Sequence, residues 1–213
     1  MVLRILALSD IHQKTEILKA LLEKVDKSSI ELILVAGDIT NYGDATDASR
    51  AIEMLSFAKV LAVPGNLDTK DVVAYLKKEN KLLHRKCIEF KGITFCGFGG
   101  GLIGSVGECL YSELEIEEHL RKIIRPNCVL VTHLPPKDTK LDLSEGEHIG
   151  SNAVRKIILE KKPLLSICGH AHGAYGKIAL GSTTCINVAA VKEGRAAIIE
   201  IKDGKVTTQR LSA

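Results

Sequence analysis

Five short apolar runs in this sequence end in residues that can bind a metal ion. The last of them, Leu164–Cys168, is followed by Gly169 and then by His170 and His172. Short apolar runs bounded by turn residues are typical of buried β-strands. Because ligands of open α/β sheets bind beyond the carboxyl ends of the strands, the repeated pattern predicts one site at a shared sheet edge.

The other four runs lead to two carboxylates, one amide and two more imidazoles. A single aspartate after a strand would be unremarkable, because aspartate and asparagine favour turns. Here, however, four of the chain's seven histidines fall at strand ends, which is more than chance placement explains. The complete set of candidate metal ligands is Asp10, His12, Asp38, Asn66, His133, His170 and His172.

Strands and helices alternate in the first third of the chain. Apolar residues at helical spacing separate three apolar runs, at residues 2–8, 32–36 and 60–63. This order favours right-handed crossovers and a parallel sheet. Residues 87–96 and 177–211 read instead as antiparallel strands, and Ser112 and Ser151 are candidate N-caps of two further helices. We expect an α/β fold of two mixed sheets packed face to face with helices outside, formed by residues 1–213 as one domain.

The mixture of oxygen and nitrogen ligands indicates a transition metal. Such a set suits Mn²⁺, Fe²⁺, Zn²⁺ or Ni²⁺ better than Mg²⁺ or Ca²⁺, which prefer oxygen ligands. Seven ligands are too many for one tetrahedral site but fit two ions that share a carboxylate. A pair of ions can activate a water molecule and hold two oxygens of a tetrahedral centre, which is the chemistry of phosphoryl transfer. Two divalent metal ions, with Mn²⁺ favoured, are therefore the expected cofactors.

The order of these motifs resembles the calcineurin-like metallophosphoesterase superfamily over nearly the whole chain. The motifs are Asp10-Ile11-His12, Gly37-Asp38, Gly65-Asn66-Leu67-Asp68, a lone His133 and Gly169-His170-Ala171-His172. The resemblance implies a four-layer αββα sandwich, which agrees with the order of elements read from the sequence. It also implies in-line attack of a metal-bridging hydroxide on phosphorus, without a phospho-enzyme.

The resemblance further divides the ligands between two ions. It assigns one metal to Asp10, His12 and His172. It assigns the other metal to Asn66, His133 and His170, with Asp38 bridging the two. Gly169 is interpreted as the position where the backbone bends sharply beside both ions.

Leu67 departs from many relatives, which have a histidine at this position beside the ligand asparagine. A leucine cannot protonate a leaving group, so either another residue does so or the substrates have good leaving groups. His148, on the long polar loop after the His133 strand, is our candidate donor; a solvent-exposed loop histidine without a role is an equal alternative. The expected catalytic residues are thus Asp38, Asn66, His133 and His148.

The substrate class follows from a finer similarity. Residues 132–142 and 148–151 are similar to small stand-alone prokaryotic phosphoesterases related to cyclic-nucleotide phosphodiesterase-like proteins. This similarity and Leu67 favour a small phosphodiester substrate over a phosphomonoester. A nuclease is disfavoured because the net charge of +3 is mild and no basic, aromatic-interleaved stripe is present. A non-catalytic interaction scaffold of the same fold would have no need of all seven ligands.

Several other residues near the motifs have competing interpretations. Residues 99–104 match a dinucleotide-binding glycine pattern, but no helix begins at once, so we expect a flexible loop that leaves room for substrate. Asp68 could orient Asn66 or cap the helix that follows it. Asn187 is interpreted as a turn residue near the site, and His84 is expected to be exposed and without a role.

The cysteines and the hydropathy of the chain indicate the cellular compartment of the protein. The six cysteines show no CxxC pair and lie mostly in apolar runs, so we expect buried thiols rather than disulfides or a zinc site. The N-terminal apolar run is too short to span a membrane and carries no secretory cleavage signature. We therefore expect a cytoplasmic protein with no membrane partner. The exposed edges of a two-sheet sandwich often pair between subunits, so the sequence is compatible with a homo-oligomer.

Overall fold

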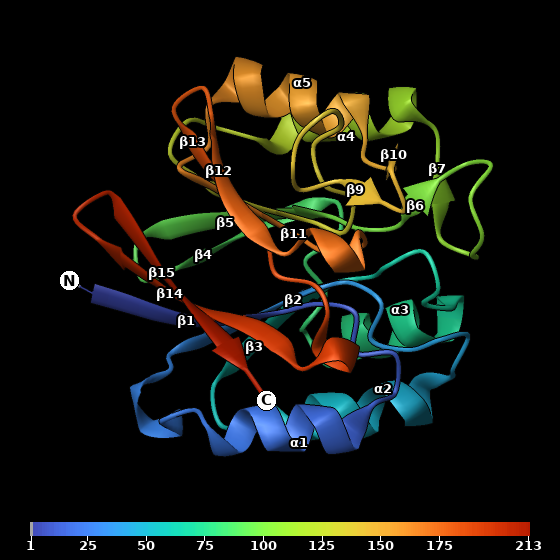
Figure 1. The fold of residues 1–213 in the computed structure, drawn as a ribbon, viewed down its shortest axis with the longest axis vertical. Helices are drawn as coiled ribbons and strands as arrows, with labels where there is room; N and C mark the ends of the chain where they lie inside the picture. The colour runs from blue at the N-terminus through green and yellow to red at the C-terminus, as the bar shows by residue number, and fades with distance from the viewer. Residues whose placement is uncertain (1) are drawn as a thin grey trace.

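The computed structural model describes residues 2–213, which form four layers (Figure 1). Two β-sheets lie face to face at the centre, and α-helices cover the outer face of each sheet. This is the αββα sandwich expected from the sequence. Among the described residues, no helix is both long and apolar enough to cross a membrane.

The first sheet contains both ends of the chain. Its strand order is β15 (Lys205–Ser212), β14 (Arg195–Lys202), β1 (Val2–Leu8), β2 (Leu32–Ala36) and β3 (Lys59–Val63). Strands β1, β2 and β3 are parallel, whereas β14 and β15 form a hairpin that pairs antiparallel with β1. The helices of this half are α1 (Thr15–Glu23), α2 (Ala45–Met54) and α3 (Lys70–Lys78), with a 3₁₀ turn η1 (Lys27–Ser29) after α1.

The second sheet is built from the middle of the chain. Its strand order is β12 (Gly176–Leu180), β13 (Thr183–Asn187), β11 (Leu165–Cys168), β8 (Val129–Thr132), β5 (Ile93–Phe98) and β4 (Lys86–Phe90). The four inner strands are parallel, and β4 and β12 are antiparallel edges. The helices are α4 (Glu113–Ile123) and α5 (Asn152–Lys161). The connections contain β6 (Gly101–Leu102), β7 (Leu110–Tyr111), β9 (Leu143–Ser144), β10 (Glu147–His148), η2 (His172–Ala174) and η3 (Val191–Glu193).

The apolar core continues through the layers. Every residue of β2 is buried, as expected for a strand whose sheet is covered on both faces. Leu34 belongs to the core between the two sheets, together with Phe95 and Ile167 of the second sheet. Ile33 and Val35 belong to the core between the first sheet and its helices. Burial of a large side chain such as Phe95 contributes about 2–3 kcal/mol.

Local sequence signals set the helix starts as expected. Ser112 caps α4 and forms a capping box with Glu115, and the side chain of Ser151 caps α5. A further capping box, between Asp44 and Asp47, begins α2. Such caps satisfy backbone N–H groups that have no partner within the helix, and each contributes about 1 kcal/mol.

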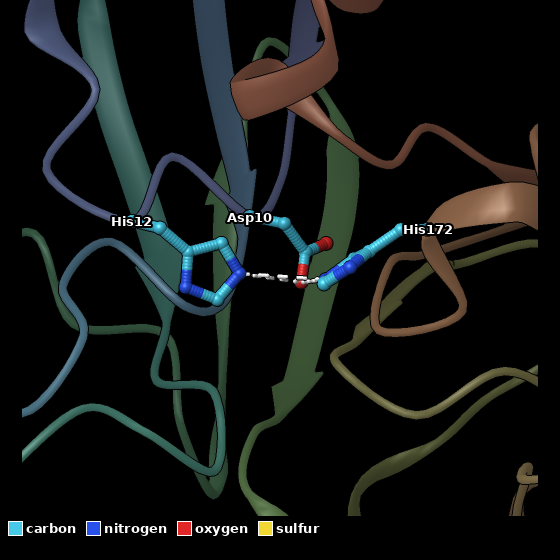
Figure 2. Close-up of side chains that lie close together, drawn as sticks. All are labelled: Asp10, His12 and His172. Carbon is cyan, nitrogen blue, oxygen red and sulfur yellow. Dashed lines mark hydrogen bonds and ion pairs between the residues drawn. The ribbon is translucent and has the colours of Figure 1, made fainter.

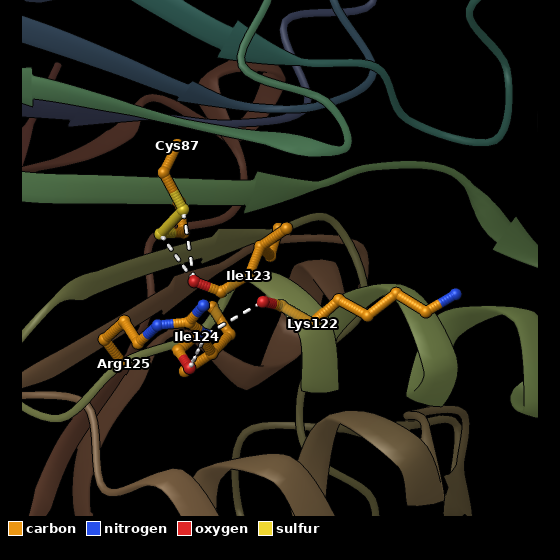
Figure 3. The surroundings of a disulfide bond; sticks show 6 residues. Cys87, Lys122, Ile123, Ile124 and Arg125 are labelled. Atoms are coloured by element: carbon orange, nitrogen blue, oxygen red, sulfur yellow. Dashed lines mark hydrogen bonds between the residues drawn. A yellow bond between two sulfur atoms is a disulfide. The ribbon is translucent and has the colours of Figure 1, made fainter.

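The expectation that the chain forms no disulfide is wrong for one pair of cysteines. Cys87 and Cys96 are bonded to each other across the hairpin of β4 and β5 (Figure 3). They are direct partners in the antiparallel register, so hairpin pairing brings their side chains together. Both sulfurs also lie against the carbonyl oxygen of Ile123, at 3.4 and 3.7 Å. The other four cysteines are buried thiols, as expected.

Candidate metal centre

Asp10, His12 and His172 form one cluster at the edge of the sandwich (Figure 2). Asp10 and His12 follow β1 of the first sheet, whereas His172 follows β11 of the second. Nε2 of His172 lies 3.0 Å from Oδ1 of Asp10, and Nε2 of His12 lies 3.6 Å from the same oxygen. The two Nε2 atoms are 3.4 Å apart. The three ligand atoms are therefore close enough for one metal ion to contact all of them.

A second cluster is centred on His133, which follows β8. Nδ1 of His133 donates to the carbonyl oxygen of Ala36 at 2.8 Å, so the lone pair of the neutral ring is on Nε2. Around Nε2 lie Oδ1 of Asn66 at 2.9 Å, Nδ1 of His170 at 3.2 Å and Oδ2 of Asp38 at 3.5 Å. These atoms are electron-rich and buried, so their convergence requires a positive charge, either a proton or a metal ion.

Asp38 lies between the two clusters. Its Oδ2 is 3.8 Å from Nε2 of His12 and 3.5 Å from Nε2 of His133. Its Oδ1 accepts a hydrogen bond from the backbone N–H of Leu67 at 2.9 Å. One carboxylate oxygen is thus held by the backbone, while the other faces both clusters. The structure brings all seven sequence-predicted ligands together.

Four of the seven candidate ligands have a left-handed backbone. Their φ angles lie between 47° and 68°, and they are Asp10, His12, Asp38 and His170. A non-glycine residue in this region costs of order 1 kcal/mol, and such residues concentrate at functional sites. The surrounding fold must therefore hold these residues in place.

The role expected for Gly169 is corrected. The sharp bend falls on His170, at φ 68°, rather than on Gly169. Gly169 instead makes room for the end of β1. A Cβ atom added there would collide with Oγ of Ser9 and would lie 2.5 Å from Oδ2 of Asp10. The same Asp10 oxygen accepts a hydrogen bond from the His170 N–H at 3.0 Å, so the two loops are in direct contact.

Asp68 holds together the two loops that carry Asp38 and Asn66. Its fully buried carboxylate accepts hydrogen bonds from three backbone N–H groups, those of Ile39, Thr40 and Gly65. Burial and the nearby carboxylate of Asp38 raise the pKa of Asp68. Its observed contacts are with loop backbone rather than with the Asn66 side chain, and Thr69, not Asp68, caps α3. Both predicted roles are replaced by this one.

Asn187 fixes the loop that carries His170 and His172. It is fully buried, and its amide donates to the carbonyl oxygens of Leu141 and Ala171 at 2.8 and 2.9 Å. Arg195 also supports this loop by donating to the carbonyl oxygen of His172 at 3.0 Å. The sequence placed Asn187 near the site but indicated only a turn, and it gave no sign of Arg195, because both act on residues from distant segments.

The glycine-rich segment packs against Asn66. The carbonyl oxygen of Val106 accepts from Nδ2 of Asn66 at 2.8 Å, and the N–H of Glu108 donates to the Asn66 carbonyl at 2.8 Å. Cβ atoms added at Gly101 or Gly107 would collide with Asn66. These two glycines therefore make room for a candidate ligand, and not for a substrate as the sequence suggested.

His84 supports the other side of this segment and is half-buried rather than exposed. Its Nδ1 accepts from the N–H of Gly99 at 2.9 Å, so Nε2 carries the proton and faces Oη of Tyr111 at 3.3 Å. The guanidinium of Arg85 lies over the Tyr111 ring, 4.6 Å from its centroid. Burial, with smaller effects of Arg85 and His119, lowers the pKa of His84 to about 3. His84 is therefore a neutral structural acceptor.

The pKa shifts indicate that the two clusters attract positive charge. Burial lowers the pKa of His133, but the carboxylates of Asp38 and Asp10 outweigh it and raise the value to about 9. Burial and the neighbouring His133 lower the pKa of His170 to about 4. Burial raises the pKa of Asp10, yet its contacts with two histidines hold it well below the ordinary value. The lowered pKa keeps Asp10 ionised beside buried imidazoles.

A cavity of about 440 Å³ lies over the two clusters. Five of the candidate ligands line it, together with Gln13, Lys14, Asn41, Leu67 and Lys192. This volume is within the range of small-molecule sites. Leu67 therefore presents an apolar surface beside Asn66 and Asp38, where a polar side chain would have offered a hydrogen bond.

The structure does not place His148 in the lining of this cavity. Nδ1 of His148 lies 2.8 Å from Oδ1 of the fully buried Asp142, and its side chain is 38 % exposed. Asp142 also accepts from the N–H groups of Thr139 and Gly150, so it organises the long loop. The arrangement favours a supporting role for His148, and its part in proton transfer stays a prediction.

Known proteins share this sequence pattern and fold. The family model described as calcineurin-like phosphoesterase matches residues 3–174. An uncharacterized protein of Methanocaldococcus jannaschii is 31% identical over 196 residues, which cover 87% of this chain and 87% of that protein.

Solved structures with the same fold are more distant in sequence. The protein TT1561 of Thermus thermophilus is similar at a TM-score of 0.75 and 19% identity, over 98% of this chain and 99% of that one. A structure described as a novel archaeal phosphodiesterase is similar at a TM-score of 0.53 and 13% identity, over 99% and 100% of the two chains. At such identities the likeness concerns the fold alone.

Proposed function

Because this chain belongs to the calcineurin-like phosphoesterase family, we propose that it hydrolyses small phosphate esters with two divalent metal ions, of which Mn²⁺ is favoured. The observation that carries this proposal is the convergence of seven metal-binding side chains from five strand ends. Those strand ends belong to two different sheets, and five of the seven side chains line one cavity.

The chemistry of the donor set fits a pair of divalent cations. The carboxylates of Asp10 and Asp38 are 0% and 2% exposed, and buried charges are stable only when paired or bound to a metal. One ion would be held by Asp10, His12 and His172. The other would be held by Asn66, His133 and His170, with Asp38 shared. When bound, such ions activate water and polarise phosphoryl oxygens at neutral pH.

Hydrogen bonds to the outer atoms of three ligands, His133, Asp38 and Asn66, fix their orientation. The Nδ1–H of His133 is committed to Ala36, and Oδ1 of Asp38 is committed to the N–H of Leu67. Nδ2 of Asn66 is committed to a backbone carbonyl, so Oδ1 faces the centre. Such outer contacts set the tautomer and orientation of metal ligands. These side chains are therefore already oriented to bind metal ions and need not rotate when the ions bind.

Leu67 supports a preference for phosphodiesters. A monoester dianion presents three anionic oxygens to its surroundings, and the Leu67 side of the cavity cannot donate a hydrogen bond to any of them. A diester presents fewer anionic oxygens and a second organic substituent, which can pack against an apolar side chain. Leu67 also cannot protonate the leaving group, so esters with good leaving groups should react fastest.

The proposal is tested with metal-depleted protein reconstituted with Mn²⁺. Elemental analysis should find close to two ions per chain. Bis(p-nitrophenyl) phosphate should be hydrolysed with a higher kcat/KM than p-nitrophenyl phosphate. Asp38→Asn, which removes the shared charge, should lower kcat by more than about 100-fold. Asp71→Asn, an exposed position on α3, is the matched control.

Two results would contradict the proposal. One is a metal content below one ion per chain after reconstitution. The other is an Asp38→Asn variant that retains the wild-type rate. A higher kcat/KM for the monoester would remove the diester preference but would leave the phosphoesterase assignment intact.

A further inference from the structure

Two lysines line the cavity beside the Asp10 cluster. Lys14 is two residues after His12, and Lys192 lies in η3, where its backbone N–H donates to the carbonyl oxygen of Asp10 at 3.1 Å. Lys14 is exposed and Lys192 is half-buried. Within residues 2–213, neither ammonium group has a hydrogen-bond or ion-pair partner. Both charges are therefore available to a ligand in the cavity.

The positive charge of the cavity exceeds what one phosphodiester would neutralise. The two lysines alone balance the carboxylates of Asp10 and Asp38. Two divalent ions would add four positive charges, whereas a diester brings one negative charge and an activated water at most one more. The acidic neighbour Glu193 is already paired with Arg195 at 2.8 Å. An excess of positive charge therefore remains on the lysine side of the cavity.

The position of Lys14 adds to this excess. Lys14 is the N-cap residue of α1, and its side chain makes no cap hydrogen bond. A cation at this end of a helix is unfavourable, because the helix dipole is positive there. An anion bound by Lys14 would meet both the ammonium group and the positive end of α1.

We propose that Lys14 and Lys192 bind a second phosphate group of the substrate. The natural substrates would then be phosphate esters that carry another phosphate beside the one that is cleaved. Lysine is a common phosphate ligand because its ammonium group is a compact charge with three donors. The excess charge and the identity of the cleaved group rest on the proposed function, whereas the subsite itself rests on the two lysines that line the cavity.

The test compares ligands that differ by a single phosphonate group. Binding of α,ω-alkane bisphosphonates to the Mn²⁺-loaded protein is measured by calorimetry, with alkylphosphonates of the same chain length as the reference. A series of chain lengths allows for any spacing between the two groups. At one length or more, the second phosphonate should tighten binding by roughly 10-fold, as expected for a hydrogen bond to a charged group.

This gain should disappear in the Lys14→Ala, Lys192→Ala double variant, while binding of the alkylphosphonates is retained. Lys205→Ala, at the exposed first residue of β15, controls for net charge. Circular dichroism and thermal unfolding establish that the variants are folded. Lys14→Gln with Lys192→Gln, which keeps more of the side-chain packing, provides a second double variant.

Equal affinity for the two ligand types at every length would overturn the proposal. So would a gain that persists in both double variants. These ligands are not hydrolysed, so the result does not depend on turnover. If bis(p-nitrophenyl) phosphate is not cleaved but the lysine-dependent gain is found, the proposed function fails and the anion subsite remains.

Discussion

Gly169 is the residue at which an added methyl group would disturb the metal centre most directly. A Cβ atom there would press on Ser9 and Asp10 from the facing sheet. We expect Gly169→Ala to lower the free energy of unfolding by about 1–3 kcal/mol, the usual cost of overpacking. Because Asp10 is displaced, Mn²⁺ affinity should fall as well. Urea unfolding and Mn²⁺ titration measure the two effects.

Gly173→Ala is the matched control in the same loop. Beyond its two chain neighbours, no heavy atom of residues 2–213 lies within 4 Å of a Cβ atom added at Gly173. This variant should keep wild-type stability and metal affinity. If Gly169→Ala behaves in the same way as Gly173→Ala, the close approach of the two loops is not needed for metal binding.

His84 gives the protein a pH dependence that can be isolated. In the folded chain its pKa is lowered from 6.5 to about 3, so between these values the unfolded chain binds a proton that the folded chain does not. Stability due to His84 is therefore complete above pH 6.5 and is lost as the pH falls toward 3. His84→Asn keeps an acceptor for Gly99 but cannot titrate.

Between pH 7.5 and 4.5 the wild type should lose about 2.5–3 kcal/mol more stability than His84→Asn. Urea unfolding at both pH values, under the same metal conditions, gives this difference. If the free energy of unfolding depends on pH in the same way in both proteins, the pKa of His84 is not lowered by folding. The effect of the substitution itself on the free energy of unfolding is measured at pH 7.5, where His84 is neutral in both the folded and the unfolded chain.

Some residues of the candidate site can be predicted from local sequence patterns, whereas others are revealed only by the structure. Each predicted ligand lies just after one of five apolar runs, so a local pattern identifies it, and the structure brings all seven together. Asn187 and Asp68 act on loops from other parts of the chain, and their sequence neighbours do not specify those contacts. The sequence predicts the sharp turn at Gly169 rather than at His170, because backbone strain has no sequence signature when a non-glycine residue bears it.

At the scale of elements, the β4–β5 hairpin is fastened by the Cys87–Cys96 disulfide (Figure 3). The crosslink closes a short loop, so the chain-entropy model gives it about 2–3 kcal/mol. The Cys87→Ser, Cys96→Ser variant should lose about this much stability. Metal content should be retained, because Asn66 is anchored separately through Glu108 and Val106.

Thiol titration of the denatured protein checks the bond directly. The wild type should show four reactive thiols before reduction and six after it, in agreement with four free cysteines and one disulfide. Six thiols before reduction would exclude the bond. A large loss of metal in the serine variant would instead show that the hairpin also positions the ligands.

The elements defined by short-range signals were predictable. The hairpin at residues 87–96 and the N-caps Ser112 and Ser151 are each encoded within a few neighbouring residues, and all three are observed. The sequence also predicted antiparallel strands after residue 176. It did not reveal that β12 and β13 join the second sheet while β14 and β15 join the first. That division depends on partners far away in the chain.

At the scale of the whole molecule, the metal centre lies across the contact between the two sheets. Asp10, His12, Asp38 and Asn66 come from the first sheet, and His133, His170 and His172 come from the second. Bound ions would therefore stabilise the sandwich itself. At a free Mn²⁺ concentration of 100 times Kd, each ion should add about 2.7 kcal/mol. For a chain of this size that corresponds to roughly 5–10 °C in Tm per ion.

Differential scanning calorimetry over a range of Mn²⁺ concentrations measures this stabilisation. Tm should rise with the logarithm of Mn²⁺ concentration and fall after chelation. The Asp38→Asn variant should show a smaller rise, because it lacks the shared carboxylate. A wild-type Tm that does not depend on Mn²⁺ would contradict a metal centre at this position.

The strand order of the first sheet has a consequence for synthesis on the ribosome. Strand β1 is made before its antiparallel partner β14, and residues 9–194 are made between them. Until then one edge of an apolar strand lacks its final neighbour, and unpaired edges promote aggregation. At 5–20 residues per second this interval lasts about 10–40 s. During this interval the nascent chain exposes one unpaired edge of β1, and we expect it to need protection from aggregation.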